Sequence, residues 1–305
     1  MSDDFDVTII GGGVAGISAA LWCDDLELDS VLLESKSELG GQLLSIYNAI
    51  ENYLGIEVTN GSELRDIFVK QLLKRRFELR LNSKITDLDI GEKRVVLSDG
   101  KAITSKAIII ATGVRRRRLG IEGEKEFQNK GILVSGKRDK NLVKDQTVLI
   151  VGGGDAAFEN VEILSETASR IILVHRGEHF SARKEFIAKA LRNPKVEIMK
   201  STIVKKIEGT GKVERILLEN SLTSSSEYVE IDAVLARIGV EPNTGFLRDK
   251  IRCDARGFIK INQNCETNCA GIFAVGDVAN PHSPTISSAV GMASTAIKTS
   301  LSEIY

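Results

Sequence analysis

Three glycines near the start of the chain, Gly11, Gly13 and Gly16, follow an apolar run from Val7 to Ile10 and open a segment compatible with a helix. Gly11 permits a tight turn, Gly13 lets the backbone approach a pyrophosphate, and Gly16 lets the helix pack close to the strand. Glu34 ends a second apolar run, where a carboxylate can accept hydrogen bonds from both hydroxyls of an adenosine ribose. The combination predicts a site for FAD or NAD.

The same pattern recurs further along the chain. An apolar run and three small residues repeat the spacing with an offset of 141 residues: Thr147–Val151, Gly152, Gly154 and Ala157. The position that matches Glu34 is His175, which follows the apolar run Ile171–Val174 and precedes Arg176. Because a carboxylate repels a 2′-phosphate and an arginine attracts it, the second site favours NADP over NAD.

Further apolar runs that end in loop signals predict three more strands: Ala107–Ile110, Ala233–Ile238 and Ile272–Val275. The first two end near Gly113 and Gly239, where the chain is expected to cross between domains. We therefore predict an α/β fold of two Rossmann-like (GR2-type) dinucleotide-binding domains, the second inserted in the first. The FAD-binding domain would comprise residues 1–115 and 245–305, and the inserted pyridine-nucleotide-binding-like domain residues 116–244. A closing helix is expected to begin near Thr285, and a hairpin loop near Ser221.

The composition sets limits on the function. The chain has 305 residues, 42% of them hydrophobic and 27% charged, which allows a sizeable core and about two domains. Its 41 basic and 42 acidic residues nearly cancel, so no global charge attracts nucleic acid or membrane. No apolar run could span a bilayer, and the start MSDDFD is acidic, so we expect a cytoplasmic protein. The four cysteines do not form a disulfide framework, and we predict no metal site.

Four more motifs accompany the two dinucleotide patterns: GGQL at 40–43, ENYLG at 51–55, ATG at 111–113 and GIFAVGD at 271–277. Together they make the chain similar to the low-molecular-weight thioredoxin reductases over nearly its full length. The resemblance implies a homodimer in which an FAD domain is split around an inserted pyridine-nucleotide domain. It places these residues around FAD: Gly11, Gly13, Gly16, Glu34, Gly41, Gln42, Leu43, Tyr47, Asn52, Ile85, Thr112, Gly113, Asp277 and Thr285. In the second site it places Gly152, Gly154, Asp155, Ala156 and Arg176.

Three of these residues have chemical roles that FAD binding would require. Asp277 can accept a hydrogen bond from a ribityl hydroxyl, and a helix beginning near Thr285 can place its positive end beneath the flavin pyrimidine ring. Tyr47 follows Gln42 by five residues, as in thioredoxin-reductase-like ferredoxin–NADP reductases, which also lack the dithiol and set a tyrosine against the isoalloxazine. A tyrosine in the hydrophobic core is the alternative for Tyr47.

Two departures from the family concern its chemistry. The redox dithiol CxxCD falls on residues 135–139, which read Ser-Gly-Lys-Arg-Asp, so the route from flavin through a dithiol to thioredoxin is closed there. The phosphate clamp HRRxxxR reads His175-Arg176-Gly177 and then Ser181, with Arg183 nearby. One arginine of three remains, which leaves open whether the second site holds NADP(H), another nucleotide or nothing.

No residue receives a firm catalytic role, and the candidates have alternatives. Cys265 and Cys269 could form a relocated dithiol, although two ordinary loop thiols are favoured. The basic run 115–118, with neighbouring basic residues at 137 and 138, either docks an acidic carrier such as ferredoxin or flavodoxin or forms a solvated hinge surface. His282 is either a proton donor to reduced flavin or an exposed loop residue, and Tyr305 either covers a partner's flavin or frays.

Three functions are consistent with these observations. The leading hypothesis is an FAD-dependent oxidoreductase that passes electrons through flavin without the usual dithiol and exchanges them with a protein carrier (ferredoxin, flavodoxin or thioredoxin) or a pyridine nucleotide. A second is a disulfide reductase that uses Cys265 and Cys269. A third is a flavin-bound sensor whose second site has decayed. No nucleic acid or membrane partner is expected.

Overall fold

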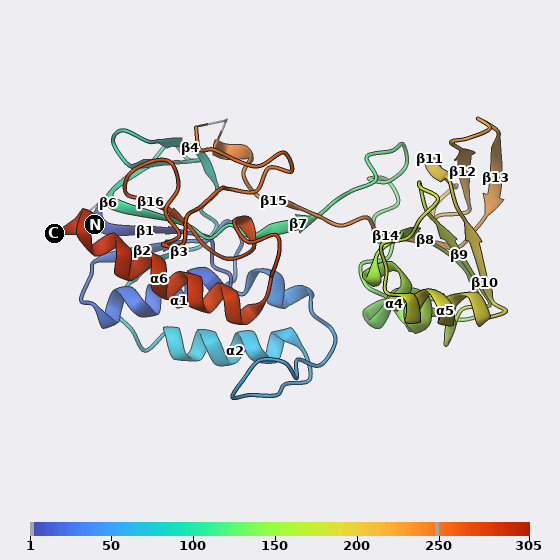
Figure 1. Ribbon diagram of the computed structural model, residues 1–305, viewed down its shortest axis with the longest axis horizontal. Coiled ribbons are helices and arrows are strands. Elements are labelled where there is room, and N and C mark those ends of the chain that lie inside the picture. Colours follow the sequence, from blue (N-terminus) through green and yellow to red (C-terminus); the bar gives the residue numbers. More distant parts are fainter. Residues whose placement is uncertain (1–2, 248–249) are drawn as a thin grey trace. The chain divides into compact units, whose positions relative to one another are not determined.

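The computed structural model describes residues 3–247 and 250–305, and the chain divides into two compact units. The first unit comprises Met1–Arg115 and Glu241–Tyr305, and the second comprises Arg116–Val240 (Figure 1). The crossing segments β7 (Val114–Arg116) and β15 (Val240–Pro242) pair with each other. Because of this pairing the chain returns to the first unit at Glu241, a few residues before the expected boundary at 245.

The first unit is built on a mixed sheet in the order β3-β2-β1-β6-β5-β4, with β16 also paired to β6. The strands that lie parallel are β1 (Asp4–Ile10), β2 (Ser30–Leu33), β3 (Glu78–Arg80), β6 (Ala102–Ile110) and β16 (Ile272–Ala274). The antiparallel additions are β4 (Ile85–Asp89) and β5 (Arg94–Leu97). The runs predicted around Val7 and Ile109 and at Ser30–Leu33 are thus confirmed as neighbouring strands.

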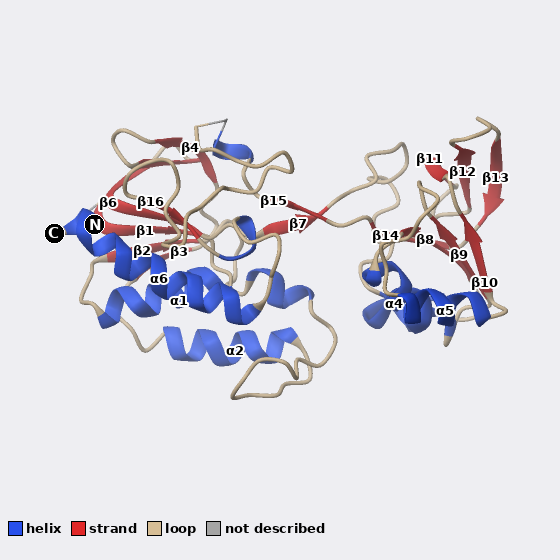
Figure 2. Ribbon diagram, viewed as in Figure 1, coloured by secondary structure: helices blue, strands red, loops and turns tan. Residues whose placement is uncertain are grey.

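Helices cover one face of this sheet (Figure 2). They are α1 (Val14–Asp25), α2 (Gly61–Leu72) and α6 (Ile286–Ile304). The unit also contains the short 3₁₀ turns η1 (Gly41–Ser45), η3 (Gly245–Leu247) and η4 (Gly276–Val278), of which η3 packs against β4 on the other side of the sheet. Small buried residues, such as Ala19 and Ala20 of α1 and Ala293 and Ala296 of α6, share one core and let the two helices approach closely. The predicted closing helix is confirmed, and Thr285 caps it. No helix within the described residues is both long enough and apolar enough to cross a membrane.

The second unit repeats the parallel arrangement on a smaller scale. Its sheet runs in the order β10-β9-β8-β14, all parallel: β8 (Thr147–Gly152), β9 (Arg170–Val174), β10 (Val196–Met199) and β14 (Ala233–Arg237). Its helical segments are α3 (Gly136–Asp139), η2 (Lys140–Val143), α4 (Asp155–Ser165) and α5 (Lys184–Arg192). An antiparallel sheet follows, made of β11 (Thr202–Glu208), β12 (Arg215–Asn220) and β13 (Ser226–Glu230). The predicted hairpin loop joins β12 to β13.

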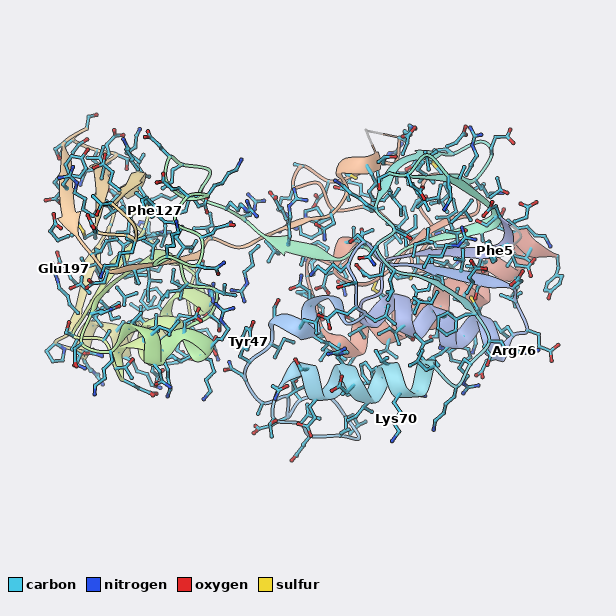
Figure 3. The ribbon with its side chains drawn as sticks, turned by 180° about the vertical axis from the view of Figure 1, so that it is seen from behind. Phe5, Tyr47, Lys70, Arg76, Phe127 and Glu197 are labelled. Carbon is cyan, nitrogen blue, oxygen red and sulfur yellow. The ribbon has the colours of Figure 1, made fainter. Side chains whose placement is uncertain are left out.

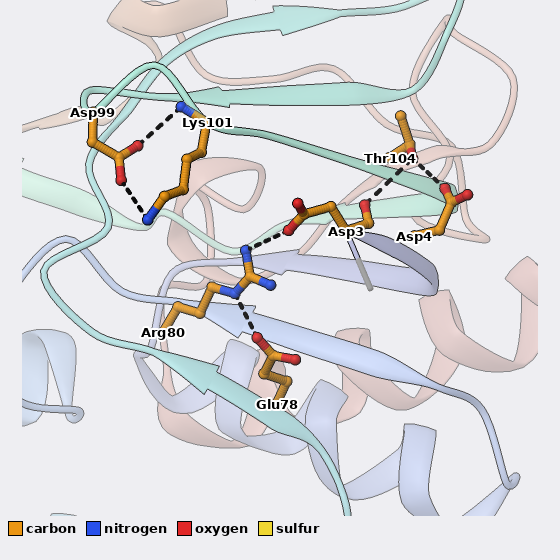
Figure 4. A network of polar contacts seen from close by, with 7 residues as sticks. All are labelled: Asp3, Asp4, Glu78, Arg80, Asp99, Lys101 and Thr104. Atoms are coloured by element: carbon orange, nitrogen blue, oxygen red, sulfur yellow. Dashed lines mark hydrogen bonds and ion pairs between the residues drawn. The ribbon is translucent and has the colours of Figure 1, made fainter. Parts of the chain in front are cut away.

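A polar network ties strands of the first unit together at its surface (Figure 4). The Arg80 guanidinium of β3 contacts Glu78 at 2.6 Å and Asp3 at 3.1 Å. The hydroxyl of Thr104 on β6 donates to the carboxylate of Asp4 on β1. Such solvent-exposed pairs contribute about 0–1 kcal/mol each, so the buried strand faces rather than this network hold the unit together.

Candidate dinucleotide sites

The turn between β1 and α1 is made largely of glycines, so its backbone is open to a ligand. A Cβ atom at Gly11 would lie 2.5 Å from the carbonyl oxygen of Ala111, and one at Gly16 would lie 1.8 Å from the carbonyl oxygen of Gly11. A Cβ atom at Gly13, by contrast, would have only the Cα of Gly41 nearby, at 3.9 Å. The first two positions therefore exclude side chains to allow close packing, while Gly13 leaves room for a ligand to approach the start of the helix.

Glu34 is held inside this turn. Its carboxylate is buried and accepts the backbone N–H of Gly12 at 2.7 Å, the backbone N–H of Lys36 at 2.9 Å and the hydroxyl of Ser35 at 3.0 Å. A carboxylate has about four acceptor positions, so with three of them used one remains for a ribose hydroxyl. The structure thus fixes the acid directly beside the phosphate-binding turn.

Asp277 lies in η4, immediately after β16. Its side chain is half-buried, burial raises the pKa of its carboxyl, and no partner contacts that carboxyl in the described part of the chain. A Cβ at Gly276 would lie 3.0 Å from the Ala15 side chain, so η4 packs beside the start of α1. A half-buried carboxylate without a partner is costly, and a ligand hydroxyl donated to it would relieve that cost.

The first turn of α6 begins next to η4. The Thr285 hydroxyl accepts the backbone N–H of Ser288 at 3.1 Å, and the Ser288 hydroxyl in turn lies 3.2 Å from the backbone N–H of Thr285. This reciprocal cap defines the positive end of a 19-residue helix. A reduced flavin carries negative charge, which such a helix end stabilises.

Other predicted residues of the first site lie around the same turn. The Thr112 hydroxyl donates to the Asn243 carbonyl at 3.0 Å, and the Asn243 amide donates to the Thr112 carbonyl at 2.8 Å. The Gln42 amide donates to the Val114 carbonyl. Glu34, Gln42, Thr112 and Asp277 therefore come from four segments of the chain and converge on one end of the sheet, as expected for a parallel α/β site.

The remaining predicted FAD residues differ in exposure. Tyr47, which is labelled in Figure 3, lies in the segment after η1. Its side chain is half-buried, so it is not a core tyrosine. Leu43 is buried, Asn52 is exposed, and Ile85 packs against a core cluster that includes Leu97. Contacts of these residues with FAD stay predictions.

The turn between β8 and α4 repeats the first cradle. A Cβ at Gly152 would lie 2.4 Å from the carbonyl oxygen of Arg237, and one at Gly153 would lie 2.3 Å from the ring of His175. At Gly154 the nearest such neighbour is the Ser181 hydroxyl, at 3.5 Å. His175 thus occupies the place that Glu34 has beside Gly12, and the second turn keeps the shape but not the acid.

Two cations lie where an adenosine ribose would meet this second turn. Arg176 is exposed and has no ion-pair partner in the described part of the chain. Lys200 directly follows β10, whose Met199 pairs in register with Val174 of β9. Its ammonium lies 5.2 Å from the centroid of the Phe180 ring, which packs 5.1 Å from the His175 ring. Sequence reasoning missed Lys200, because only strand pairing brings it beside the clamp position.

Arg183 and Asp155 form an ion pair. The Asp155 carboxylate, at the start of α4, accepts the backbone N–H of Arg183 at 2.7 Å and its Nε at 2.9 Å. The Arg183 guanidinium also lies 4.2 Å from the Phe186 ring. Arg183 is therefore paired with Asp155 in this structure, at the start of α4. Ala156 is exposed in the first turn of α4, and its contact with a nucleotide stays a prediction.

The segment in the dithiol position carries no thiol. Asp139 is buried, and its carboxylate accepts the backbone N–H groups of Val134 at 2.7 Å and Ser135 at 3.1 Å. The Arg138 Nε contacts the same carboxylate at 2.5 Å. Asp139 thus fixes the local backbone, and Arg138 is bound where the family pattern has its second cysteine.

The relocated dithiol considered as the less favoured alternative for Cys265 and Cys269 does not fit the structure, which agrees with two ordinary thiols. Cys265 is buried in the core beneath α1 and α6, and its thiol faces the Met292 carbonyl at 3.6 Å. Cys269 packs against the other core cluster, and its Sγ lies 3.7 Å from the Lys250 carbonyl. Both thiols are free. Burial also raises the pKa of the Cys265 thiol to about 11, which disfavours the reactive thiolate.

The structure also describes the surroundings of His282, Tyr305 and the basic run 115–118. His282 and Tyr305 are exposed, which agrees with the alternative that each is a solvent-facing residue. In the basic run, Arg115 contacts Glu241 at 2.7 Å and Arg117 donates to the Val240 carbonyl at 3.0 Å. These arginines hold the paired crossing strands.

Comparison with known proteins agrees with this arrangement. Residues 5–298 match the family described as pyridine nucleotide-disulphide oxidoreductase. The chain is 33% identical to a thioredoxin reductase of Treponema pallidum, over 91% of this chain and 90% of that protein. It is 31% identical to a ferredoxin–NADP reductase of Picrophilus torridus, over 91% and 86% of the two chains. The crystal structure of Lactococcus lactis thioredoxin reductase superposes with a TM-score of 0.84 at 29% identity, covering 98% of this chain and 99% of that one.

The chain has two Rossmann-like units, one inserted in the other. The first unit has Glu34 in its glycine turn and the unpartnered carboxylate of Asp277 nearby. This combination is typical of a flavin-dependent oxidoreductase. The chain belongs to the pyridine nucleotide-disulphide oxidoreductase family and is an FAD-dependent enzyme of the thioredoxin-reductase-like type. The predicted fold class and the predicted FAD requirement are thereby confirmed.

Proposed function

We propose that this enzyme transfers electrons between NADP(H), bound by the second unit, and a small redox protein, without an internal dithiol. One observation carries the proposal. The dithiol position holds Ser135 and Arg138, and the only closely spaced cysteines, Cys265 and Cys269, pack into different cores. A ferredoxin–NADP reductase among the relatives is consistent with a flavin that serves a protein carrier directly.

The residues of the first unit fit FAD. The cradle at Gly11 to Gly16 and the buried Glu34 would hold the adenosine diphosphate half, and Asp277 would accept a ribityl hydroxyl. The positive end of α6, capped by Thr285, would stabilise negative charge on the ring system. When bound, FAD supplies the ability to accept a hydride and release electrons one at a time.

The second unit supports a phosphorylated nucleotide. Arg176 and Lys200 bring two positive charges to the ends of adjacent strands, on the side where an adenosine ribose is expected. No carboxylate stands at the ribose position, because His175 replaces the acid. These charges favour the 2′-phosphate of NADP(H) over the free hydroxyl of NAD(H).

The protein carrier is proposed to be ferredoxin or flavodoxin rather than thioredoxin. A thioredoxin disulfide accepts electrons by exchange with a thiolate, and the described residues offer no paired thiols near the flavin-binding turn. Ferredoxin and flavodoxin accept single electrons and need no such exchange. The homodimer and the cytoplasmic location expected from the sequence stay predictions.

Anaerobic rapid mixing tests the proposal. The oxidised holoenzyme is mixed separately with NADPH and NADH, and flavin absorbance is followed. Oxidised ferredoxin, flavodoxin or thioredoxin is then added to the reduced enzyme. Faster bleaching by NADPH, followed by reoxidation with ferredoxin or flavodoxin, supports the proposal. Absence of bleaching by NADPH, or rapid reoxidation by thioredoxin alone, contradicts it.

A further inference from the structure

Arg237 stands at the end of β14, beside the second phosphate-binding turn. It pairs in register with Gly152 of β8, and its carbonyl oxygen lies 2.4 Å from the Cβ position of that glycine. The matching contact in the first unit joins Gly11 to the carbonyl of Ala111, at 2.5 Å. The internal repeat therefore places an arginine in the second site where the first site has an alanine.

The guanidinium of Arg237 is half-buried and shares its surroundings with another cation. Its Nη2 donates to the Val134 carbonyl at 3.0 Å, and Arg116 donates to the same carbonyl at 2.6 Å. Burial and the charge of Arg116 lower the pKa of Arg237 to about 10, so it still carries its charge at neutral pH. The carboxylates of Glu159 and Asp139 act in the opposite direction and favour the charged form of Arg237, and Asp139 also binds Arg138 and two backbone N–H groups.

The strand order shows which part of a nucleotide would meet these charges. The adenosine ribose belongs beside the strand that follows the glycine turn, which here is β9 with His175 and Arg176 at its end. The dinucleotide then crosses the turn between β8 and α4 and continues toward β14. Arg237 therefore lies on the side of the far half, which in a pyridine nucleotide carries the nicotinamide ring.

We propose that Arg237, together with Arg116, makes the second site prefer a nucleotide whose far ring is uncharged, so that reduced pyridine nucleotide binds more tightly than the oxidised form. The oxidised nicotinamide ring is a cation and the reduced ring is neutral, so only the oxidised form is repelled. This inference rests on the proposed function, in which a pyridine nucleotide occupies the second unit. Its consequence is that the oxidised product leaves readily after giving up its hydride.

Ligand binding to the oxidised holoenzyme tests the inference without any turnover. Isothermal titration calorimetry compares NADP⁺ with 1,4,5,6-tetrahydro-NADP, which has an uncharged ring and donates no hydride. The unmodified enzyme should bind the tetrahydro compound roughly tenfold more tightly, as expected for like charges interacting in a partly buried setting. A ratio near one, with both ligands bound, overturns the inference.

Variants identify the source of the preference. Arg237→Gln should move the ratio of the two dissociation constants clearly toward one, with Arg116 retaining part of the preference, whereas Arg237→Lys should keep most of the ratio. Arg170→Gln is the matched control, because Arg170 begins β9, at the amino end of the parallel strands, whereas Arg237 ends β14 at their carboxyl end. It should leave the ratio unchanged. An unchanged ratio in Arg237→Gln, in a variant with an unaltered flavin spectrum and melting temperature, would show that the inference is wrong.

The ligand 2′,5′-ADP separates this inference from the proposed function, since it lacks the nicotinamide half. If 2′,5′-ADP binds but NADP⁺ and the tetrahydro compound bind equally, the ring-charge inference fails while the nucleotide assignment stands. If 2′,5′-ADP does not bind, the assignment of the second unit fails and the inference fails with it. Equal binding of 2′,5′-ADP by the unmodified enzyme and Arg237→Gln is the supporting result.

Discussion

The carboxylate of Glu34 accepts the backbone N–H of Gly12 at 2.7 Å, inside the turn that begins α1. At the matching place in the second unit the ring of His175 lies over Gly153. The two turns have the same backbone shape and opposite electrostatic character. The first is suited to ribose hydroxyls, and the second, with Arg176 and Lys200 beside it, to a phosphate.

Glu34→Gln should weaken FAD binding by roughly tenfold or more, because a charge-assisted acceptor becomes a neutral one and its amide faces backbone donors. FAD retention after dialysis and the dissociation constant by fluorescence titration measure the effect. Glu92→Gln, in an exposed turn before β5, is the control and should retain FAD normally. Full FAD retention in Glu34→Gln would refute the role assigned to this acid.

Lys200→Ala should raise the dissociation constant of 2′,5′-ADP roughly five- to tenfold and leave that of 5′-AMP nearly unchanged, since only the first ligand has a 2′-phosphate. Calorimetry on the holoenzyme gives both constants. Lys195→Ala is a suitable control, because Lys195 precedes β10, at the opposite end of this strand from Lys200, and binds the Ser165 and Ala168 carbonyls. An equal loss of affinity for both ligands would point to a structural effect instead.

Asp277→Asn should stabilise the FAD-free protein and weaken FAD binding. Burial raises the pKa of this carboxyl, so the folded apoprotein disfavours the charged form. The apoprotein should therefore gain stability as pH falls through the range between the raised and ordinary pKa values, and Asp277→Asn should remove that gain. Melting curves of apoprotein from pH 4 to 7 test this. A pH profile identical in both proteins argues against the unpartnered carboxylate.

Cys265 should resist alkylation in the native protein while Cys269 reacts. Burial raises the pKa of the Cys265 thiol to about 11, so below that pH the thiolate needed for reaction is scarce. Iodoacetamide labelling at pH 8, read by peptide mass spectrometry, should modify Cys265 only after denaturation. The raised pKa also means that the stability it contributes is present below the ordinary thiol pKa and is lost as pH rises toward 11. Rapid native labelling of Cys265 would contradict its burial.

The sequence anticipated most of the fold because both glycine turns follow continuous apolar runs, and these runs lie within the observed strands β1 and β8. It also marked, through four motifs, the segments that converge at one end of the parallel sheet, where FAD binding stays a prediction. It could not locate Lys200 or Arg237, because their relation to the second turn depends on strand pairing. For Cys265 and Cys269 the sequence favoured two ordinary loop thiols over a CxxxC dithiol, and their positions in separate cores agree with that interpretation.

The flavin is proposed to act without a redox-active dithiol. Anaerobic titration of the holoenzyme with dithionite measures this, because each redox centre takes up a fixed number of electrons. Complete reduction is expected with about two electrons per FAD, with all four cysteines titrating as free thiols before and after. Uptake of about four electrons per FAD, accompanied by two additional thiols, would contradict it.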